Sequence, residues 1–129
     1  MRFLLDTHIW LWWTAGSPRL DPETRRIVDD RSNEVIFSAA SAWEVAIKYR
    51  IGRLALPDSP KSYVKRQLAL QSIRALDVTI EHALETAELP LHHGDPFDRV
   101  LIAQARCEGL TLVTADEALR PYAVAQLHV

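Results

Sequence analysis

The stretch Met1-Arg-Phe-Leu-Leu-Asp-Thr-His-Ile-Trp-Leu-Trp-Trp13 decides how this chain folds. The apolar run Phe3–Leu5 is short enough for a buried strand, and the apolar positions from Ile9 to Trp13 take the spacing of a helix. We therefore expect a strand, an acidic turn and a helix. In open parallel sheets, ligands bind outside the carboxyl ends of the strands, so Asp6 is expected to stand at a binding edge.

The composition predicts one soluble domain that covers residues 1–129, with 48% hydrophobic residues for its core. A net charge of -2 gives no overall signal for nucleic acid, so such binding requires a local basic face or metal ions. The single cysteine, Cys107, excludes an internal disulfide framework. No stretch approaches the roughly 18 apolar residues of a membrane span, and no signal-peptide pattern is present. We expect a cytoplasmic protein without a membrane partner.

The rest of the chain alternates short apolar runs with helical patterns, which is typical of an α/β domain. Further strands are expected at 34–37, 73–76, 110–113 and 124–127. Helices are expected at about 22–30, 38–51, 60–70, 79–87, 96–108 and 117–120, the second of them opened by Ser38-Ala-Ala-Ser41. Asp21 and Asp95 each precede a proline that suits a first helical turn, and Gly109 suits a left-handed C-terminal cap.

Four carboxylates from distant segments are expected at one edge of this sheet. In a parallel sheet with right-handed crossovers, every helix that follows a strand begins at the carboxyl edge. Asp6 and Asp116 directly follow strands. Glu44 lies in the first two turns of the helix after the second strand, and Asp98 lies at the start of the helix that leads into the fourth. The topology therefore predicts that these four side chains converge.

Each of these acids also has a structural interpretation. Ser41 and Glu44 have the spacing of a capping box, Asp95 and Asp98 suit a helix start, and Asp116 can cap a short helix. Asp6 fits such a role least, because an acid directly after three buried apolar residues is costly unless the site requires it.

The expected convergence of these carboxylates favours a bound cation at this edge of the sheet. Two carboxylates about 5 Å apart repel by roughly 3 kcal/mol at an effective dielectric near 20, so several of them require protons or a metal ion. Oxygen ligands favour Mg2+ or Mn2+ over zinc. Such an ion lowers the pKa of a water that attacks a phosphodiester and neutralises charge on the phosphate. The hydroxyls of Thr7, Ser38, Ser41 and Thr114 lie near the same edge and hold water or phosphate, or serve as caps.

Four motifs together resemble the PIN-domain family, and specifically its VapC-type toxins. They are Leu4-Leu-Asp-Thr-His8, Ser41-x-x-Glu44, Asp95-Pro-Phe-Asp-Arg-x-Leu-Ile-Ala-Gln-Ala105 and Gly109-Leu-Thr-Leu-Val-Thr-Ala-Asp116. The resemblance spans nearly the whole chain. Each motif is degenerate, but their order and spacing together are specific. The fold that it implies is a PIN-like three-layer α/β/α domain with a central, mainly parallel sheet.

The resemblance also implies an activity and partners. The activity is that of an endoribonuclease dependent on Mg2+ or Mn2+, with Asp6, Glu44, Asp98 and Asp116 at the acidic positions. The family's third acid lies eleven residues before the glycine that ends its helix, which selects Asp98 and leaves Asp95 as a cap or an outer group. The resemblance implies an RNA substrate, a homodimer and a small cognate antitoxin that blocks the site.

Several other features have more than one interpretation. The basic residues Lys48, Arg50, Arg53, Lys61, Lys65 and Arg66 form an RNA-binding surface or ordinary solvated helix faces. Arg99 contacts a phosphate or pairs with a neighbouring acid. The four tryptophans suit packing better than base stacking. His92 and His93 lack a second ligand at metal-binding spacing, which favours a plain loop, and His8 faces the pocket or turns away from it.

We predict a metal-dependent ribonuclease toxin in which Asp6, Glu44 and Asp98 hold the principal ion and Asp116 assists. One alternative is a PIN-type nuclease for RNA processing that has no toxin role. An aspartyl-phosphate enzyme is a weaker alternative, because it requires an acid two residues after its nucleophile and His8 occupies that position. A catalytically silent binding domain is the alternative from another class. The sequence contains no pattern that identifies the RNA that is cleaved.

Overall fold

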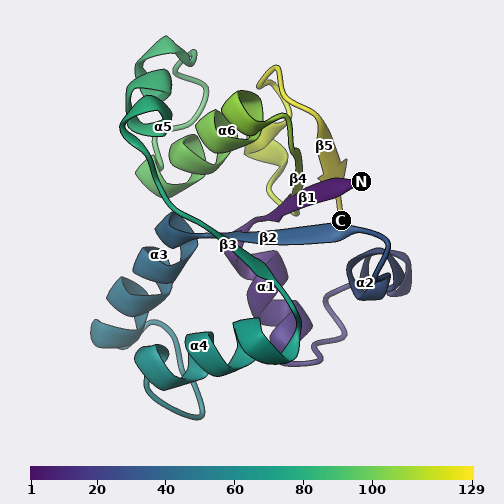
Figure 1. The fold of residues 1–129 in the computed structure, drawn as a ribbon. Coiled ribbons are helices and arrows are strands. Elements are labelled where there is room, and N and C mark those ends of the chain that lie inside the picture. Colours follow the sequence, from purple (N-terminus) through teal and green to yellow (C-terminus); the bar gives the residue numbers. More distant parts are fainter.

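The computed structural model describes residues 1–129 and contains a five-stranded sheet in the order β3-β2-β1-β4-β5 (Figure 1). The strands are β1 Arg2–Leu5, β2 Glu34–Ser38, β3 Arg74–Leu76, β4 Thr111–Thr114 and β5 Gln126–His128. All neighbouring strands are parallel. The prediction of a mainly parallel sheet is therefore confirmed, and the sheet is parallel throughout. Because β1 is central, Leu4 aligns with Ile36 on one side and with Leu112 on the other.

Six α-helices and two short 3-10 helices connect the strands. The α-helices are α1 Thr7–Thr14, α2 Pro22–Asp29, α3 Ala39–Arg50, α4 Pro60–Leu70, α5 Ile80–Glu85 and α6 Pro96–Glu108. The 3-10 helices are η1 Thr86–Glu88 and η2 Glu117–Leu119. None of the helices combines the length and apolar character that a membrane crossing requires.

The helices cover both faces of the sheet, which gives the three layers that were expected (Figure 1). On one face, Phe3 and Leu5 pack in a buried cluster with residues of α1, α2, α3 and α4, including Trp10 and Tyr63. On the other face, Leu4 packs with α6 and the chain around η2. Successive residues of a strand point to opposite faces, so β1 contributes to both clusters. The two clusters fix the depth of β1, and therefore the position of Asp6 at its end.

The helix boundaries follow local capping chemistry. The Asp21 carboxylate accepts a hydrogen bond from the Thr24 backbone N–H, and Asp95 accepts from Phe97 and Asp98 in the same way. Gly109 ends α6 in the left-handed conformation that was expected, with φ of 66°.

The helix after β2 opens where it was expected, with Ser38 as its cap and Ala39 as its first residue. Other boundaries differ from the expectation by one or two residues. The last strand begins at Gln126 instead of 124. The Val124 N–H is bonded to Tyr122 in a tight turn, so pairing with β4 starts only where the Ala125 carbonyl accepts from Leu112.

Candidate active site

A pocket of about 330 Å³ lies at the carboxyl edge of the sheet. All four acids that the topology was expected to bring together line it, namely Asp6, Glu44, Asp98 and Asp116. Its other lining residues are His8, Trp12, Lys48, His93, Asp95 and Ala115. The acids come from the end of β1, from α3, from the first turn of α6 and from the loop after β4. They converge because the strands are parallel and the helices begin where the strands end.

Asp6 is 5% exposed and stands between β1 and α1. Its side chain makes no capping bond to the helix that it precedes. Instead, its Oδ2 accepts a hydrogen bond of 2.7 Å from the buried Thr114 hydroxyl, whose oxygen accepts from the Asp116 backbone N–H at 3.0 Å. Burial raises the pKa of Asp6, and the Thr114 bond opposes that rise. Thr114 therefore couples the ends of β1 and β4.

Glu44 is also buried, and both of its carboxylate oxygens have partners. The Thr7 hydroxyl donates to Oε1 at 2.6 Å, and Lys48 Nζ lies 2.6 Å from Oε2. Ser41 Oγ lies 2.9 Å from the Thr7 hydroxyl. The capping-box interpretation of Ser41 and Glu44 is wrong, because Ser38 provides the cap, while Ser41 contacts Thr7 and Glu44 lines the pocket.

Asp95 and Asp98 have different environments although they are three residues apart. Asp95 lines the pocket but uses Oδ1 to cap α6, accepting from Phe97 and Asp98 at 2.8 and 3.2 Å. Asp98 points into the pocket, where burial and the nearby charge of Asp6 raise its pKa to about 7. A carboxyl that holds a proton to neutral pH is one that a cation would ionise.

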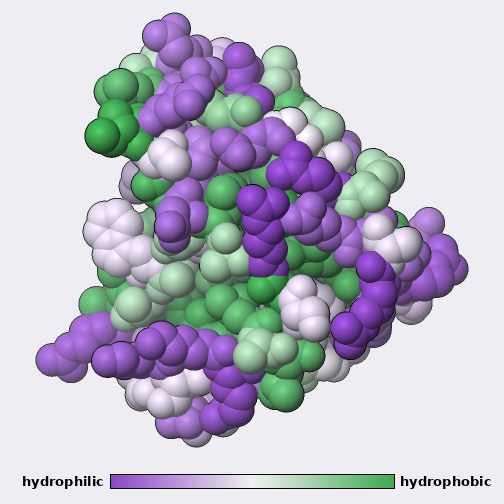
Figure 2. Space-filling view, viewed as in Figure 1, coloured by the Kyte–Doolittle hydropathy of each residue, from purple (hydrophilic) through white to green (hydrophobic).

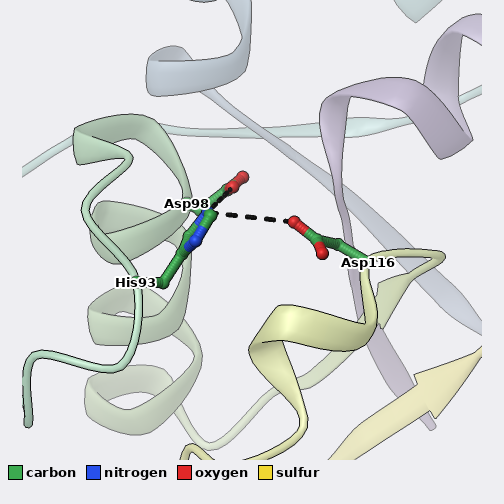
Figure 3. A group of neighbouring side chains, drawn as sticks. All are labelled: His93, Asp98 and Asp116. Atoms are coloured by element: carbon green, nitrogen blue, oxygen red, sulfur yellow. Dashed lines mark hydrogen bonds and ion pairs between the residues drawn. The ribbon is translucent and has the colours of Figure 1, made fainter.

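His93 lies against the acids, contrary to the interpretation of His92 and His93 as a plain loop. Its Nε2 lies 2.8 Å from Asp98 Oδ2 and 3.8 Å from Asp116 Oδ2. Figure 3 shows Asp98 and Asp116 approaching the imidazole from α6 and from the loop after β4. Asp116 uses its other oxygen to cap η2 at the Ala118 N–H. No local pattern reveals this contact, because it depends on the position of one loop against α6.

Arg99 holds the loop that carries His93 in place. Its guanidinium donates to the backbone carbonyls of Thr86, Leu89, Pro90 and His93 at 2.7–3.3 Å, and to the Tyr122 hydroxyl at 3.1 Å. The interpretation of Arg99 as the partner of a neighbouring acid is therefore wrong, since the guanidinium binds backbone carbonyls instead. Arg99 instead fixes the chain that carries His93.

A second hollow, of about 580 Å³, adjoins the acidic pocket and shares His8, Trp12 and Lys48 with it. His8 therefore lines both the acidic pocket and this second hollow. Arg19 and Arg53 add positive charge, the Arg19 guanidinium lies 5.5 Å from the Trp12 ring centre, and no acid lines this hollow. We call it the basic groove. Of the basic residues singled out in the sequence, only Lys48 and Arg53 line it, and Arg66 pairs with Asp58 instead.

An apolar surface lies on the outer side of α3. Trp43, which is 64% exposed, packs edge-on against Phe97, and together with Ile47, Val78 and Val100 it lines a hollow of about 410 Å³. We call these five residues the Trp43 patch. Trp10, in contrast, is fully buried between Phe37 and Tyr63, as core packing predicts. Figure 2 shows how hydrophobic and hydrophilic residues are distributed over one face of the molecule.

Sequence comparison places this arrangement in a known family. The family model for the PIN domain matches residues 3–125. The chain belongs to the PIN-domain family. Ribonuclease VapC22 of Mycobacterium tuberculosis is 32% identical over 120 residues, covering 92% of this chain and 90% of the relative. Ribonuclease VapC16 of the same organism is 45% identical over 60 residues, which are 46% of this chain and 43% of that protein. That second match thus spans less than half of the relative.

Solved PIN-domain structures share the fold. VapBC2 from Rickettsia felis, bound to a DNA fragment from its promoter, has a TM-score of 0.74 at 15% identity, over 99% of this chain and 98% of that one. VapBC from Salmonella typhimurium, also bound to DNA, has a TM-score of 0.68 at 16% identity, over 99% and 98%. At these identities the comparison establishes the α/β/α architecture.

Proposed function

We propose that this PIN-domain protein is a Mg2+- or Mn2+-dependent endoribonuclease and the toxin of a toxin-antitoxin pair. The observation that carries the proposal is the convergence of four carboxylates from four segments in one pocket. The two related proteins named as ribonucleases support the substrate class. An action in the cytoplasm, where RNA substrates are present, is part of this proposal.

The residues present fit a divalent cation. The pocket offers carboxylate oxygens, which Mg2+ and Mn2+ prefer. Burial, together with the charges of neighbouring acids, raises the pKa values of Asp6 and Asp98, and a cation would stabilise the ionised form of both. Asp6, Glu44 and Asp98 would hold the ion, with Asp116 assisting directly or through water. When bound, the ion supplies an activated water and charge neutralisation at the scissile phosphate.

The chain's own residues set up this chemistry. Thr114 holds Asp6, and Thr7 holds Glu44, so that their carboxylates keep fixed orientations in the pocket. Lys48 neutralises Glu44 and also faces the basic groove, where a phosphate is a competing partner. Arg19, Arg53 and the Trp12 ring offer charge and a stacking surface to an RNA strand that leaves the pocket.

We also propose two protein partners. The first is a small antitoxin that covers the pocket, by analogy with the VapBC complexes that share this fold. The second is another copy of this chain, seated on the Trp43 patch. A large apolar surface with an exposed aromatic ring is costly to leave in water, and α3 and α6 contribute to it together.

The test compares RNA cleavage by the wild-type protein and by Asp6→Asn. Wild type is expected to cleave single-stranded RNA with Mg2+ or Mn2+ and to stop when a chelator is added. Asp6→Asn is expected to lose at least a hundredfold in rate while keeping its circular dichroism spectrum. Asp77→Asn, an exposed conservative change, should cleave like wild type.

Three other outcomes would contradict parts of the proposal. Full cleavage by folded Asp6→Asn would remove that residue from the site. Absence of divalent-ion binding in titration calorimetry would favour a silent binding domain. A protein that cleaves RNA in vitro but does not arrest growth when it is expressed would favour an RNA-processing nuclease. So would a growth arrest that no small neighbouring protein relieves.

A further inference from the structure

His93 is the histidine whose ring nitrogen directly contacts acids of the pocket, and nothing in the acidic motifs assigns it a role. Its Nε2 lies 2.8 Å from Asp98 Oδ2 and 3.8 Å from Asp116 Oδ2 (Figure 3). One donor atom from each of the three side chains lies within 4.8 Å of the others. Adjacent ligand atoms around a six-coordinate ion with bonds near 2.1 Å are about 3 Å apart. The three atoms are therefore close enough together to reach one ion after small shifts of their side chains.

The backbone around His93 is fixed from three sides. Its N–H donates to the Tyr122 hydroxyl at 2.9 Å, its carbonyl accepts from Arg99 at 3.3 Å, and Arg99 also binds the carbonyls of Leu89 and Pro90. His92, the preceding residue, is exposed and packs against the Tyr122 ring instead. The chain thus holds one imidazole at the pocket and turns its neighbour away, which limits the motion of the Nε2 atom.

We propose that His93 is a nitrogen ligand of the divalent ion and makes the site favour Mn2+ over Mg2+. The inference rests on the proposed metal site. An imidazole among carboxylates shifts affinity toward transition-metal ions, because Mg2+ prefers oxygen donors and binds nitrogen poorly. The same Nε2 makes the hydrogen bond to Asp98, so this nitrogen already faces the pocket in which the ion would lie.

The competing role for His93 is positioning alone, in which its N–H orients Asp98 and never contacts the ion. His93→Gln separates the two. A glutamine can hydrogen-bond to Asp98 but supplies no imidazole nitrogen. His92→Ala is the matched control, because it removes an imidazole from the same loop without touching the pocket.

The experiment titrates Mn2+ and Mg2+ into metal-free wild type and variants, and records electron spin-echo modulation of bound Mn2+ with and without 15N-labelled histidine. We expect 14N coupling from histidine in wild type and His92→Ala. His93→Gln should lose the coupling and bind Mn2+ at least tenfold more weakly, while its Mg2+ affinity stays within about threefold.

Bound Mn2+ without histidine coupling in wild type, or coupling that persists in His93→Gln and disappears in His8→Ala, would overturn the inference. Full Mn2+ affinity in His93→Gln would overturn it too, in favour of positioning. Failure of wild type to bind Mn2+, or equal binding by Asp6→Asn, is a different result, because it removes the active-site assignment itself.

Discussion

Asp98 occupies a site where the fold opposes its ionisation. Burial and the charge of Asp6 raise its pKa from 3.8 to about 7, although the His93 bond acts in the other direction. The folded state therefore holds this proton more tightly than the unfolded chain does. Above neutral pH the ionised Asp98 therefore lowers the stability of the folded state, and a divalent ion bound at the pocket would offset this loss. This is the trade of stability for function that active sites commonly make.

This linkage gives a stability prediction for the metal-free protein. Between about pH 4 and pH 7, the free energy of unfolding should fall as pH rises, because the unfolded chain has already lost the Asp98 proton that the folded state keeps. Asp98→Asn should remove this fall and be more stable at pH 8 by roughly 2–4 kcal/mol. Urea titrations across this range measure the effect. Asp77→Asn should follow wild type, and a flat wild-type profile would contradict the raised pKa.

Thr114 is predicted to be essential to the pocket although it is fully buried. Thr114→Val keeps the shape but removes the bond to Asp6 and the acceptor for the Asp116 N–H. We expect the free energy of unfolding to fall by about 1–3 kcal/mol. We also expect Mn2+ affinity at pH 7 to fall severalfold, since the pKa of Asp6 rises further. Calorimetry measures both, and Thr111→Val, on the same strand, should have little effect on ion binding.

The acids could be predicted from the sequence, whereas the groups around them could not. Asp6 follows a short apolar run, so its place at the sheet edge depends only on local pattern and on the parallel topology. The position of His93 depends on a loop that Arg99 and Tyr122 hold from elsewhere in the chain. Thr114 likewise acquires its role only when β4 lies beside β1.

At the scale of elements, the chain between α5 and α6 depends on a single side chain. Arg99 binds four carbonyls there, and its planar guanidinium offers donors that lysine does not have. Loss of this side chain leaves those carbonyls without their partner, so the segment should open locally before the domain unfolds.

Arg99→Lys is therefore expected to speed amide exchange in residues 86–93 by tenfold or more and to weaken Mn2+ binding, without change in the exchange of β1. Hydrogen-exchange mass spectrometry measures this directly. Arg106→Lys, which changes an arginine on the same helix, should leave that segment protected. Equal protection in Arg99→Lys would show that other contacts hold the loop.

The basic groove makes a separate prediction about RNA affinity. In the inactive Asp6→Asn background, Arg53→Glu should weaken binding of a short single-stranded RNA. It should also reduce the slope of log affinity against log salt by about one, as loss of a phosphate contact does. Fluorescence anisotropy at several salt concentrations measures both. Arg31→Glu, at the opposite edge of the sheet, carries the same charge change, and an equal effect there would indicate only nonspecific electrostatics.

At the scale of the whole molecule, the Trp43 patch predicts a homodimer. Trp43→Glu places a charge at the centre of the surface shared by α3 and α6, and it is expected to give a monomer at micromolar concentration in sedimentation velocity. Leu70→Glu changes an equally exposed apolar residue on α4 and should stay dimeric. A monomeric wild type would contradict the proposed assembly.

The overall architecture could be predicted because alternating apolar runs and helical patterns allow few arrangements. The strands β1, β2 and β4 were predicted closely, since each contains a buried apolar run and lies inside the sheet. The last strand was misplaced by two residues because β5 lies at an edge, where its start depends on a turn at Tyr122. The Trp43 patch could not be located from helical spacing alone, because the spacing does not show which side of α3 meets the sheet.

The central strand of the sheet pairs with a strand far along the chain, since Asp6 and Thr114 are 108 residues apart and yet share a hydrogen bond. During translation, β1 can pair with β4 only after β4 has left the ribosome, so neither the complete sheet nor the acid cluster can form earlier. A nascent chain of this protein therefore has no assembled nuclease centre while ribosomal RNA lies beside it. The order of the strands thus delays the activity until synthesis of the domain is nearly complete.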